Sequence, residues 1–263
     1  MDRQGRRLKG PRVLVVDVGN TSIAFGVYRG GRVDCVRFVE HGGDVRELRQ
    51  VLQPGDLGTI EACAVASVVP GLNRGIQRLV RDLWRVQVFW VRADRRLGLR
   101  INYPRRSRIG ADRLANAVAA ARIVGLPVII ADFGTALTFD VVVPQRGYVG
   151  GIILPGPSII LECLAERTAL LPRVEPAAVR GAYGRSTEQA MRLGWSWGYP
   201  AMVDRVTARL QRAVGGRAKL CATGGQAKRI VRRLERRYRV IPDLTLRGIG
   251  MIYEMNVPRE RSG

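Results

Sequence analysis

Two short segments of the chain share a pattern of residues that could bind phosphate. Residues 15–26 read VVDVGNTSIAFG and residues 131–140 read ADFGTALTFD. In each segment an apolar run leads to an aspartate, Asp17 or Asp132, and then to an apolar residue, a glycine and a small polar residue. Glycine lets a backbone approach a ligand closely, and a tight turn can aim several N–H groups at one anion. A carboxylate and a phosphate are both negative and repel each other. We therefore expect the aspartate to act through a cation or to accept a proton.

The repetition of this turn is stronger evidence for a phosphate-binding site than either copy alone. A single Asp-x-Gly segment is most often a plain β-turn. Two copies, each after a buried strand and at matching places in the chain, predict two turns that grip a polyphosphate and its metal from both sides. A third glycine turn, Thr223-Gly224-Gly225, also follows an apolar run and could flank the nucleoside. An ordinary strand-to-helix turn is the more common meaning of that third sequence.

The elements that must position these turns follow from the spacing of the apolar residues. The first half predicts three strands at residues 12–39, a helix at 44–53, a strand at 60–70, a helix at 72–84, a strand at 86–91 and an alanine-rich helix at 111–124. At residue 127 the pattern restarts with another hairpin. We therefore predict an α/β protein made by internal duplication, with domains at 12–125 and 126–257 packed around a cleft. Residues 1–11 are predicted to be a disordered basic extension.

The charge of the chain is far from average. Lysine and arginine number 44 against 22 aspartate and glutamate, which gives a net charge of +22 in 263 residues. Arginine suits phosphates and carboxylates, so nucleic acid is one candidate partner. The arginines are spread along the whole chain, which favours a solvated surface that attracts polyanions without specificity. The densest basic run, KRIVRRLERRYR at 228–239, is predicted to be a helix with Ile230, Val231 and Leu234 turned inward.

Some classes of function are made improbable by the composition. None of the four cysteines forms a CxxC pair or another metal-ligand spacing. With one histidine, His41, a histidine metal site or a Ser-His-Asp triad elsewhere is nearly excluded. No signal peptide or membrane-spanning run is visible, and we expect a soluble cytoplasmic protein.

Taken together, the motifs resemble those of the type III pantothenate kinases, within the acetate kinase/sugar kinase/Hsp70/actin superfamily. The resemblance covers nearly everything from Val13 to Asn256. Its motifs are DVGNT (17–21), SVVP (67–70), GADRLANAVAA (110–120), DFGTALTFD (132–140), GGIILPG (150–156), TALLP (168–172), STEQAMRLG (186–194), TGG (223–225) and PDLTLRGIGMIYEMN (242–256). The resemblance implies two ribonuclease-H-like (actin-like ATPase) domains with an ATP cleft between them. It also implies transfer of the ATP γ-phosphoryl group to the 4′-hydroxyl of pantothenate, and a homodimer.

The resemblance further implies roles for the phosphate loops. The first loop would bind ATP through Asp17, Val18, Gly19, Asn20, Thr21, Ser22, Ile23 and Ala24. Asp17 would also hold Mg²⁺, in this interpretation through water. Asp132 would bind a monovalent cation, K⁺ or NH₄⁺, and Thr135 would contact ATP phosphate. Gly224 and Gly225 would complete the ATP site.

The resemblance also implies that a separate group of residues holds pantothenate. These residues are Tyr103, Gly110, Ala111, Asp112, Arg113 and Thr187. Asp112 would be the catalytic base, since a carboxylate within hydrogen-bond reach can take the proton of an alcohol as the bond to phosphorus forms.

Four of these residues also have a purely structural interpretation from their positions alone. Asp112 could cap the 111–124 helix, and Thr187 could cap the helix that follows it. Arg113 could form a surface salt bridge instead of pairing with the substrate carboxylate. Tyr103 could simply pack against Pro104.

The chain departs from the family pattern at several positions. Ser186 stands where asparagine is usual, and Pro157 where an aliphatic residue is usual. Arg105, Arg106 and Arg108 crowd a loop that is more typically acidic. Two alternatives to a pantothenate kinase therefore stay open: a nucleic-acid-binding or transcription accessory protein on the same fold, and a kinase for another small alcohol.

Overall fold

The structure is a computed structural model that describes residues 10–40, 42 and 45–257. Its contacts divide the chain into two compact units. The described residues up to Ile123 and those from Asp243 onward form unit 1, and Val124–Pro242 form unit 2. His41 and most of the predicted N-terminal extension lie outside the described residues.

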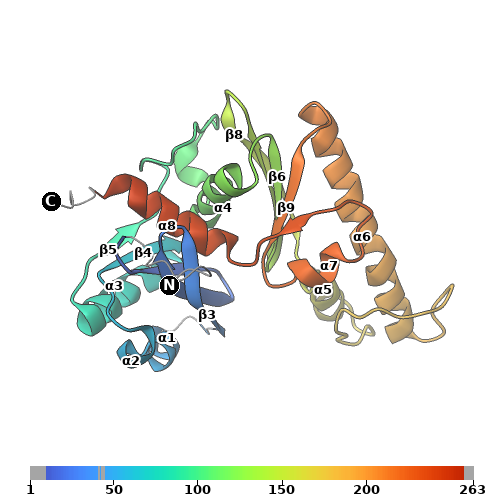
Figure 1. Ribbon diagram of the computed structural model, residues 1–263. Coiled ribbons are helices and arrows are strands. Elements are labelled where there is room, and N and C mark those ends of the chain that lie inside the picture. The colour runs from blue at the N-terminus through green and yellow to red at the C-terminus, as the bar shows by residue number, and fades with distance from the viewer. Residues whose placement is uncertain (1–9, 41, 43–44, 258–263) are drawn as a thin grey trace, which may run out of the picture. The chain divides into compact units, whose positions relative to one another are not determined.

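Unit 1 is built on a five-stranded sheet with the order β3-β2-β1-β4-β5. β1 is antiparallel to β2 and parallel to β4, and β4 is parallel to β5. The strands are β1 (Val13–Val18), β2 (Ser22–Arg29), β3 (Arg32–Glu40), β4 (Ala62–Ser67) and β5 (Val88–Trp90). The helices are α1 (Val45–Val51), α2 (Pro54–Leu57), α3 (Pro70–Trp84), the 3₁₀ helix η1 (Arg106–Arg108), α4 (Ala111–Ile123) and α8 (Leu244–Asn256) (Figure 1).

Unit 2 repeats this sheet. Its strand order is β10-β9-β6-β7-β8, in which β6 is antiparallel to β7 and parallel to β9. The strands are β6 (Val128–Phe133), β7 (Ala136–Val143), β8 (Gly147–Pro155), β9 (Lys219–Thr223) and β10 (Arg239–Val240). The helices are α5 (Ile159–Arg167), α6 (Thr187–Ala213) and α7 (Ala227–Val231).

The two sheets match down to the register of the aspartates. In unit 1, Asp17 lies opposite Ala24 of β2 and Ala66 of β4. In unit 2, Asp132 lies opposite Thr138 of β7 and Thr223 of β9. Each aspartate is thus the penultimate residue of the central strand, with an antiparallel neighbour on one side and a parallel neighbour on the other. The predicted duplication of an α/β unit is confirmed.

The central strand β1 is apolar from Val13 to Val16 because both faces of the sheet of unit 1 are covered. Successive side chains of a strand point to opposite faces. Leu14 and Val16 of β1 pack with Leu72 and Ile76 of α3 in one buried cluster. The intervening Val15 is also fully buried, and α8 contacts β1, β2 and β4. A strand covered on both faces reads as a continuous apolar run, as the sequence indicated.

Helix α8 belongs to unit 1 although it follows unit 2 in the sequence. It packs against α4 so tightly that a Cβ at Gly248 would overlap the backbone of Ala115. A Cβ at Gly250 would overlap the ring of Tyr28, whose hydroxyl donates to Glu254 Oε2 at 2.9 Å. The sequence-based domain of residues 126–257 therefore differs from the compact unit of the structure, which ends at Pro242. The division into domains at 12–125 and 126–257 stays a prediction.

The predicted basic helix at 228–239 is wrong in length. Helix α7 ends at Val231, and the chain continues through short turns in which Arg233 N–H donates to Ile230 O and Leu234 N–H donates to Val231 O. Two causes act together. Arginines at 229 and 233 and at 232 and 236 would repel one another at helical i,i+4 spacing, and the Asp204 carboxylate accepts the Glu235 N–H at 2.9 Å. Ile230 is buried and Leu234 packs against the core, as predicted.

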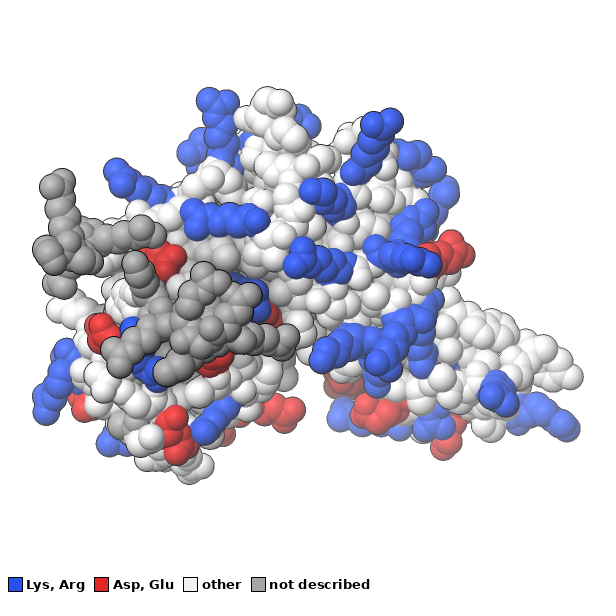
Figure 2. Space-filling model, in the orientation of Figure 1, with Lys and Arg blue, Asp and Glu red and all other residues white. Residues whose placement is uncertain are grey.

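Basic side chains are spread over the surface that Figure 2 shows, with acidic ones scattered among them. This distribution favours a solvated basic surface over a single concentrated patch. None of the helices in the described part of the chain combines the length and the apolar content of a membrane span.

Candidate active site

The first predicted phosphate loop is a hairpin turn at the carboxyl end of β1. Gly19 N–H donates to Ser22 O at 3.0 Å and closes the turn. Asn20 and Thr21 at its tip are exposed, and Asp17 at its base is half-buried. Val18 and Ile23 are fully buried. Of the eight predicted ATP residues from Asp17 to Ala24, these two can therefore face a ligand only with their backbone.

The second loop repeats this turn at the end of β6. Gly134 N–H donates to Ala136 O at 3.2 Å, and Thr135 at the tip is exposed. Gly156 N–H donates to Thr135 O at 3.0 Å, and a Cβ at Gly156 would overlap the Thr135 backbone. Residue 156 must be glycine for the chain after β8 to support the turn this closely.

The third glycine turn meets the second loop within unit 2. Gly224 has a φ of +91°, which lies in the left-handed region that favours glycine. A Cβ at Gly224 would lie 2.5 Å from Asp132 Oδ1 and 2.7 Å from the Phe133 backbone. Gln226 N–H donates to Phe133 O at 3.2 Å and ties the two turns together. The structure therefore brings Asp132 and Gly224 together, at the carboxyl ends of the parallel strands β6 and β9.

Asp112 lies in the first turn of α4 in unit 1. The helix begins at Ala111, and Leu114 N–H donates to Gly110 O at 3.1 Å. Asp112 is the second helical residue, so it is not the N-cap that the structural interpretation required. Its Oδ1 accepts the Arg113 backbone N–H at 2.8 Å and lies where a Cβ at Gly110 would be. The motif thus needs glycine at 110 to leave room for the carboxylate.

The surroundings of Asp112 favour a carboxylate that takes up a proton. Burial raises the pKa of Asp112 above its ordinary value, and the hydrogen bond from Arg113 N–H and the Arg113 charge lower it by less. Desolvation disfavours the charged form of a carboxyl group, so proton uptake is easier than for an exposed aspartate. A raised pKa of this kind is typical of a general base.

A pocket of about 830 Å³ opens beside this turn. It lies at the carboxyl ends of β4 and β5, and Gly110 and Ala111 of the predicted substrate site line it. Ligands of open α/β sheets commonly bind outside the carboxyl ends of parallel strands. The pocket therefore places a ligand-sized space next to Asp112.

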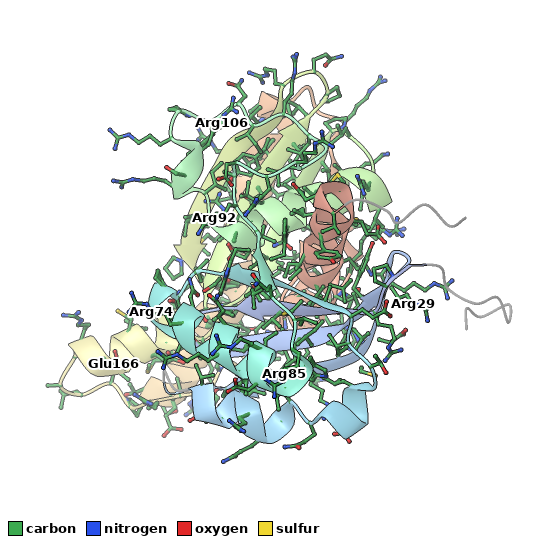
Figure 3. The ribbon with its side chains drawn as sticks, turned by 90° about the vertical axis from the view of Figure 1, so that its left-hand side faces the viewer. Arg29, Arg74, Arg85, Arg92, Arg106 and Glu166 are labelled. Carbon is green, nitrogen blue, oxygen red and sulfur yellow. The ribbon has the colours of Figure 1, made fainter. Side chains whose placement is uncertain are left out.

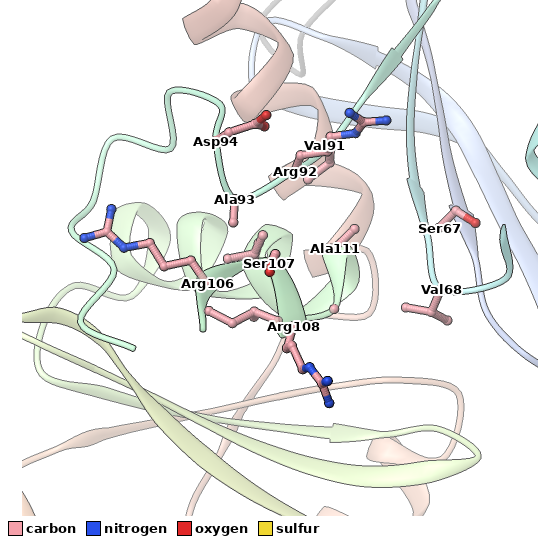
Figure 4. A pocket seen from close by; sticks show the side chains of 13 residues that line it. Ser67, Val68, Val91, Arg92, Ala93, Asp94, Arg106, Ser107, Arg108 and Ala111 are labelled. Carbon is pink, nitrogen blue, oxygen red and sulfur yellow. The ribbon is translucent and has the colours of Figure 1, made fainter. Parts of the chain in front are cut away.

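Several residues of this pocket were not predicted from the sequence. Ser67, Arg92, Asp94 and Ser107 line it as well (Figure 4). Ser67 ends β4, and Arg92 and Asp94 follow β5 closely. A signal was present in the sequence, because polar residues at or just after the carboxyl ends of two neighbouring parallel strands meet at the same edge of a sheet.

The remaining predicted substrate residues are divided between the units. Tyr103 and Arg113 are half-buried in unit 1, whereas Thr187 is an exposed residue of unit 2. Thr187 is the first residue of α6 and not its cap; Ser186 is the N-cap, and its Oγ accepts the Gln189 N–H at 3.2 Å. Two statements stay predictions. One is that Thr187 shares a site with Tyr103 and Arg113, and the other is that loops of both units contact one ATP.

These two matching sheets, each with an Asp-x-Gly hairpin, define the duplicated fold of the actin-like ATPases and sugar kinases. A solved structure of the same class is the activator of 2-hydroxyisocaproyl-CoA dehydratase from Clostridium difficile with bound ADPNP, with a TM-score of 0.52 and 12% identity. The structural match covers 92% of this chain and 93% of the activator. A Campylobacter jejuni protein described under the Baf family of transcriptional activators has a TM-score of 0.56 and 18% identity, over 92% of this chain and 98% of its own. At these identities the likenesses show the fold alone.

The sequence comparisons are more specific. The family model for type III pantothenate kinase matches residues 13–209. The chain is 37% identical over 252 residues to the type III pantothenate kinase of Roseiflexus sp., which covers 93% of this chain and 99% of that relative. It is also 42% identical over 198 residues to the type III pantothenate kinase of Akkermansia muciniphila, and this match covers 75% of this chain and 80% of that relative. The chain belongs to the type III pantothenate kinase family, and the predicted family and fold class are confirmed.

Proposed function

We propose that this chain transfers the γ-phosphoryl group of ATP to the 4′-hydroxyl of pantothenate. The observation that carries the proposal is the desolvated carboxylate of Asp112, held at the start of α4 beside a ligand-sized pocket, in a chain of this family. An alcohol is a poor nucleophile at neutral pH, so a base that takes its proton is needed at the moment of attack.

In this mechanism Asp112 accepts the proton of the 4′-hydroxyl as its oxygen bonds to the γ-phosphorus, and ADP leaves. The exposed turn residues Asn20, Thr21 and Thr135 supply backbone and hydroxyl donors to the phosphates. Tyr103, Arg113 and Thr187 orient the acceptor, with the Arg113 guanidinium paired with its carboxylate. Catalysis otherwise depends on positioning and on donors placed where charge develops.

The described residues fit a divalent cation that is bound with ATP. They contain no cluster of three or more His, Cys, Asp or Glu side chains that could hold a metal alone. Mg²⁺ is commonly bound by one or two carboxylates together with waters and substrate phosphates, and Asp17 offers such a carboxylate at the base of its turn. When bound, Mg²⁺ neutralises charge on the phosphates.

The same proposal includes K⁺ or NH₄⁺ at Asp132. The half-buried carboxylate lies against the Gly224 turn, within unit 2. It also includes a cytoplasmic homodimer, which rests on the family resemblance. Nucleic acid would bind only through the net positive charge, and such binding would weaken steeply as salt rises.

The test is a coupled ADP-release assay with Mg-ATP, pantothenate and a panel of other small alcohols, in K⁺, NH₄⁺ or Na⁺. We expect turnover with pantothenate that K⁺ or NH₄⁺ stimulates. Turnover with another alcohol and none with pantothenate would select the kinase of different specificity. No turnover with any alcohol in any cation, together with nucleic-acid binding that survives high salt, would favour the transcription accessory alternative.

A further inference from the structure

The second Asp-x-Gly loop is in backbone contact with the turn that follows β8, residues 155–157. Gly156 N–H donates to Thr135 O at 3.0 Å, and a Cβ at Gly156 would overlap the Thr135 backbone. Pro155, the last residue of β8, lies opposite Ala136 of β7. Because the two segments touch along their backbones, a shift of the turn must also move Thr135.

The turn itself receives little support from its own residues or from the helix that follows. Prolines at both of its ends have no backbone N–H to donate. Helix α5 begins two residues after the turn. Of its nine described residues only Leu161 is buried, and Glu166 near its end is exposed (Figure 3). The position of the turn therefore depends on contacts from elsewhere in unit 2.

Trp195 of α6 supplies such a contact. Its indole N–H donates to Pro157 O at 2.8 Å, and both residues are buried. The Trp195 ring stacks on that of Tyr199, with centroids 6.0 Å apart and an interplanar angle of 16°. The Tyr199 hydroxyl lies 3.5 Å from Pro155 O. Two aromatic side chains one helical turn apart thus contact both ends of the turn.

The indole ring is also fixed by its other neighbours. The guanidinium carbons of Arg229 and Arg233 lie 5.5 and 5.1 Å from a ring centroid of Trp195. A guanidinium group over an aromatic ring at such a distance is attracted to it. Trp195 also belongs to the buried cluster of Phe133, the residue that precedes the second loop. A ring with these contacts and only 3% exposure has little freedom to move, so it can hold Pro157 O in one place.

We propose that Trp195 is a positioning residue of the phosphoryl transfer: through Pro157 and Gly156 it sets the position of Thr135, and thereby the affinity for the nucleotide. The contact of Thr135 with phosphate rests on the proposed function, whereas the connection from the indole to Thr135 does not. Trp195 contacts no reacting atom in this proposal. A tryptophan that only filled the core would stabilise unit 2 without changing the nucleotide affinity of the folded protein.

The test compares Trp195→Phe with Trp197→Phe in the whole protein. Trp195→Phe keeps an aromatic ring and removes the donor to Pro157 O. Trp197 lies on the same helix and is 54% exposed, so the same substitution there is a matched control. Calorimetry without pantothenate measures binding of AMPPNP, a non-hydrolysable ATP analogue, with Mg²⁺. Hydrogen exchange of the Gly156 amide and initial rates of ADP release complete the comparison.

In Trp195→Phe we expect AMPPNP binding to weaken by about fivefold or more, because a buried carbonyl that loses its donor lets the turn shift. The KM for ATP should rise by the same factor, whereas the KM for pantothenate should change by less than about twofold. The Gly156 amide should exchange faster, since its hydrogen bond to Thr135 O opens more often. Trp197→Phe should match the wild type in each measurement.

Equal AMPPNP binding and equal Gly156 exchange in the wild type and in Trp195→Phe would overturn the proposal. A lower kcat with both KM values unchanged, as expected when less of the variant is folded, would show a structural role alone and would also overturn it. If the wild type does not phosphorylate pantothenate, the proposed function fails. Weaker AMPPNP binding and faster Gly156 exchange in Trp195→Phe would then still support the positioning role.

A second variant decides the question if Trp195→Phe does not fold. The chain has four tryptophans, and Trp84→Phe/Trp90→Phe/Trp197→Phe leaves Trp195 as the only one. Saturating AMPPNP should then change the fluorescence of Trp195, because the loop that binds phosphate is connected to the indole. Fluorescence that stays the same while calorimetry shows AMPPNP bound would rule out the connection.

Discussion

Replacement of Asp112 by asparagine should lower turnover and raise stability at the same time. Asparagine keeps the shape of the side chain and an oxygen that can accept the Arg113 N–H, which Asp112 Oδ1 accepts at 2.8 Å. It cannot take up a proton as a base. Loss of a general base typically costs about 10²- to 10⁴-fold in kcat, which is about 2.7–5.4 kcal/mol of transition-state stabilisation.

The effect on stability follows from the pKa of Asp112. Burial raises that pKa in the folded state, so the charged carboxylate is less favourable in the folded protein than in the unfolded chain. Its stabilising contribution is present below the unfolded pKa and is lost as the pH rises through the folded pKa. At neutral pH the wild type therefore bears a cost that Asp112→Asn removes, and the difference should vanish in acid. For the same reason the kcat of the wild type should fall as the pH drops through the raised pKa.

The assay combines kcat from coupled ADP release with urea denaturation at neutral and acidic pH. Asp82→Asn, at an exposed position of α3, is the control that removes one carboxylate elsewhere in unit 1. A kcat of Asp112→Asn within about threefold of the wild type would refute the role of Asp112 as the general base. A variant that loses activity together with stability at neutral pH would contradict the burial argument, since the side chain would then act mainly as a structural anchor.

Three further predictions test other features. Gly224→Ala should destabilise the fold by about 1–3 kcal/mol, because its φ is +91° and its Cβ would meet the Asp132 carboxylate; urea denaturation and ATP titration would show the loss. Gly250→Ala should cost about 1–3 kcal/mol because its Cβ would overlap the Tyr28 ring, whereas Gly194→Ala, with open space in α6, should stabilise by about 0.5–1 kcal/mol. Asp132→Asn should abolish stimulation by K⁺ in the ADP-release assay, and stimulation that persists would place the cation elsewhere.

Much of the fold could be predicted from local pattern. The apolar runs of β1 and β6 and the Asp-x-Gly turns after them are short-range signals, and both were found at matching places in the two sheets. The family motif at 110–113 also pointed to the first turn of α4. What it could not show is that Asp112 follows the cap position, because helix boundaries depend on backbone hydrogen bonds that sequence patterns place only within a few residues.

The parts that could not be predicted depend on contacts between distant residues. Helix α7 ends early because Asp204, on another helix, binds the backbone at Glu235. The pocket arginines at 92, 106 and 108 lie in two separate segments, and only the fold brings them to one opening. The placement of α8 in unit 1 likewise depends on two glycines that fit against Ala115 and Tyr28.

The position of α8 has a consequence for biosynthesis. Leu244, Leu246, Ile249 and Ile252 of this helix are buried in unit 1, yet they are among the last described residues of the chain. Domains generally fold as units, in the order in which the ribosome releases them. Unit 2 is a continuous segment and can complete its core while translation continues, whereas unit 1 must wait for its final helix. A nascent chain stalled before residue 244 should therefore carry a protease-resistant second unit and a protease-sensitive first one.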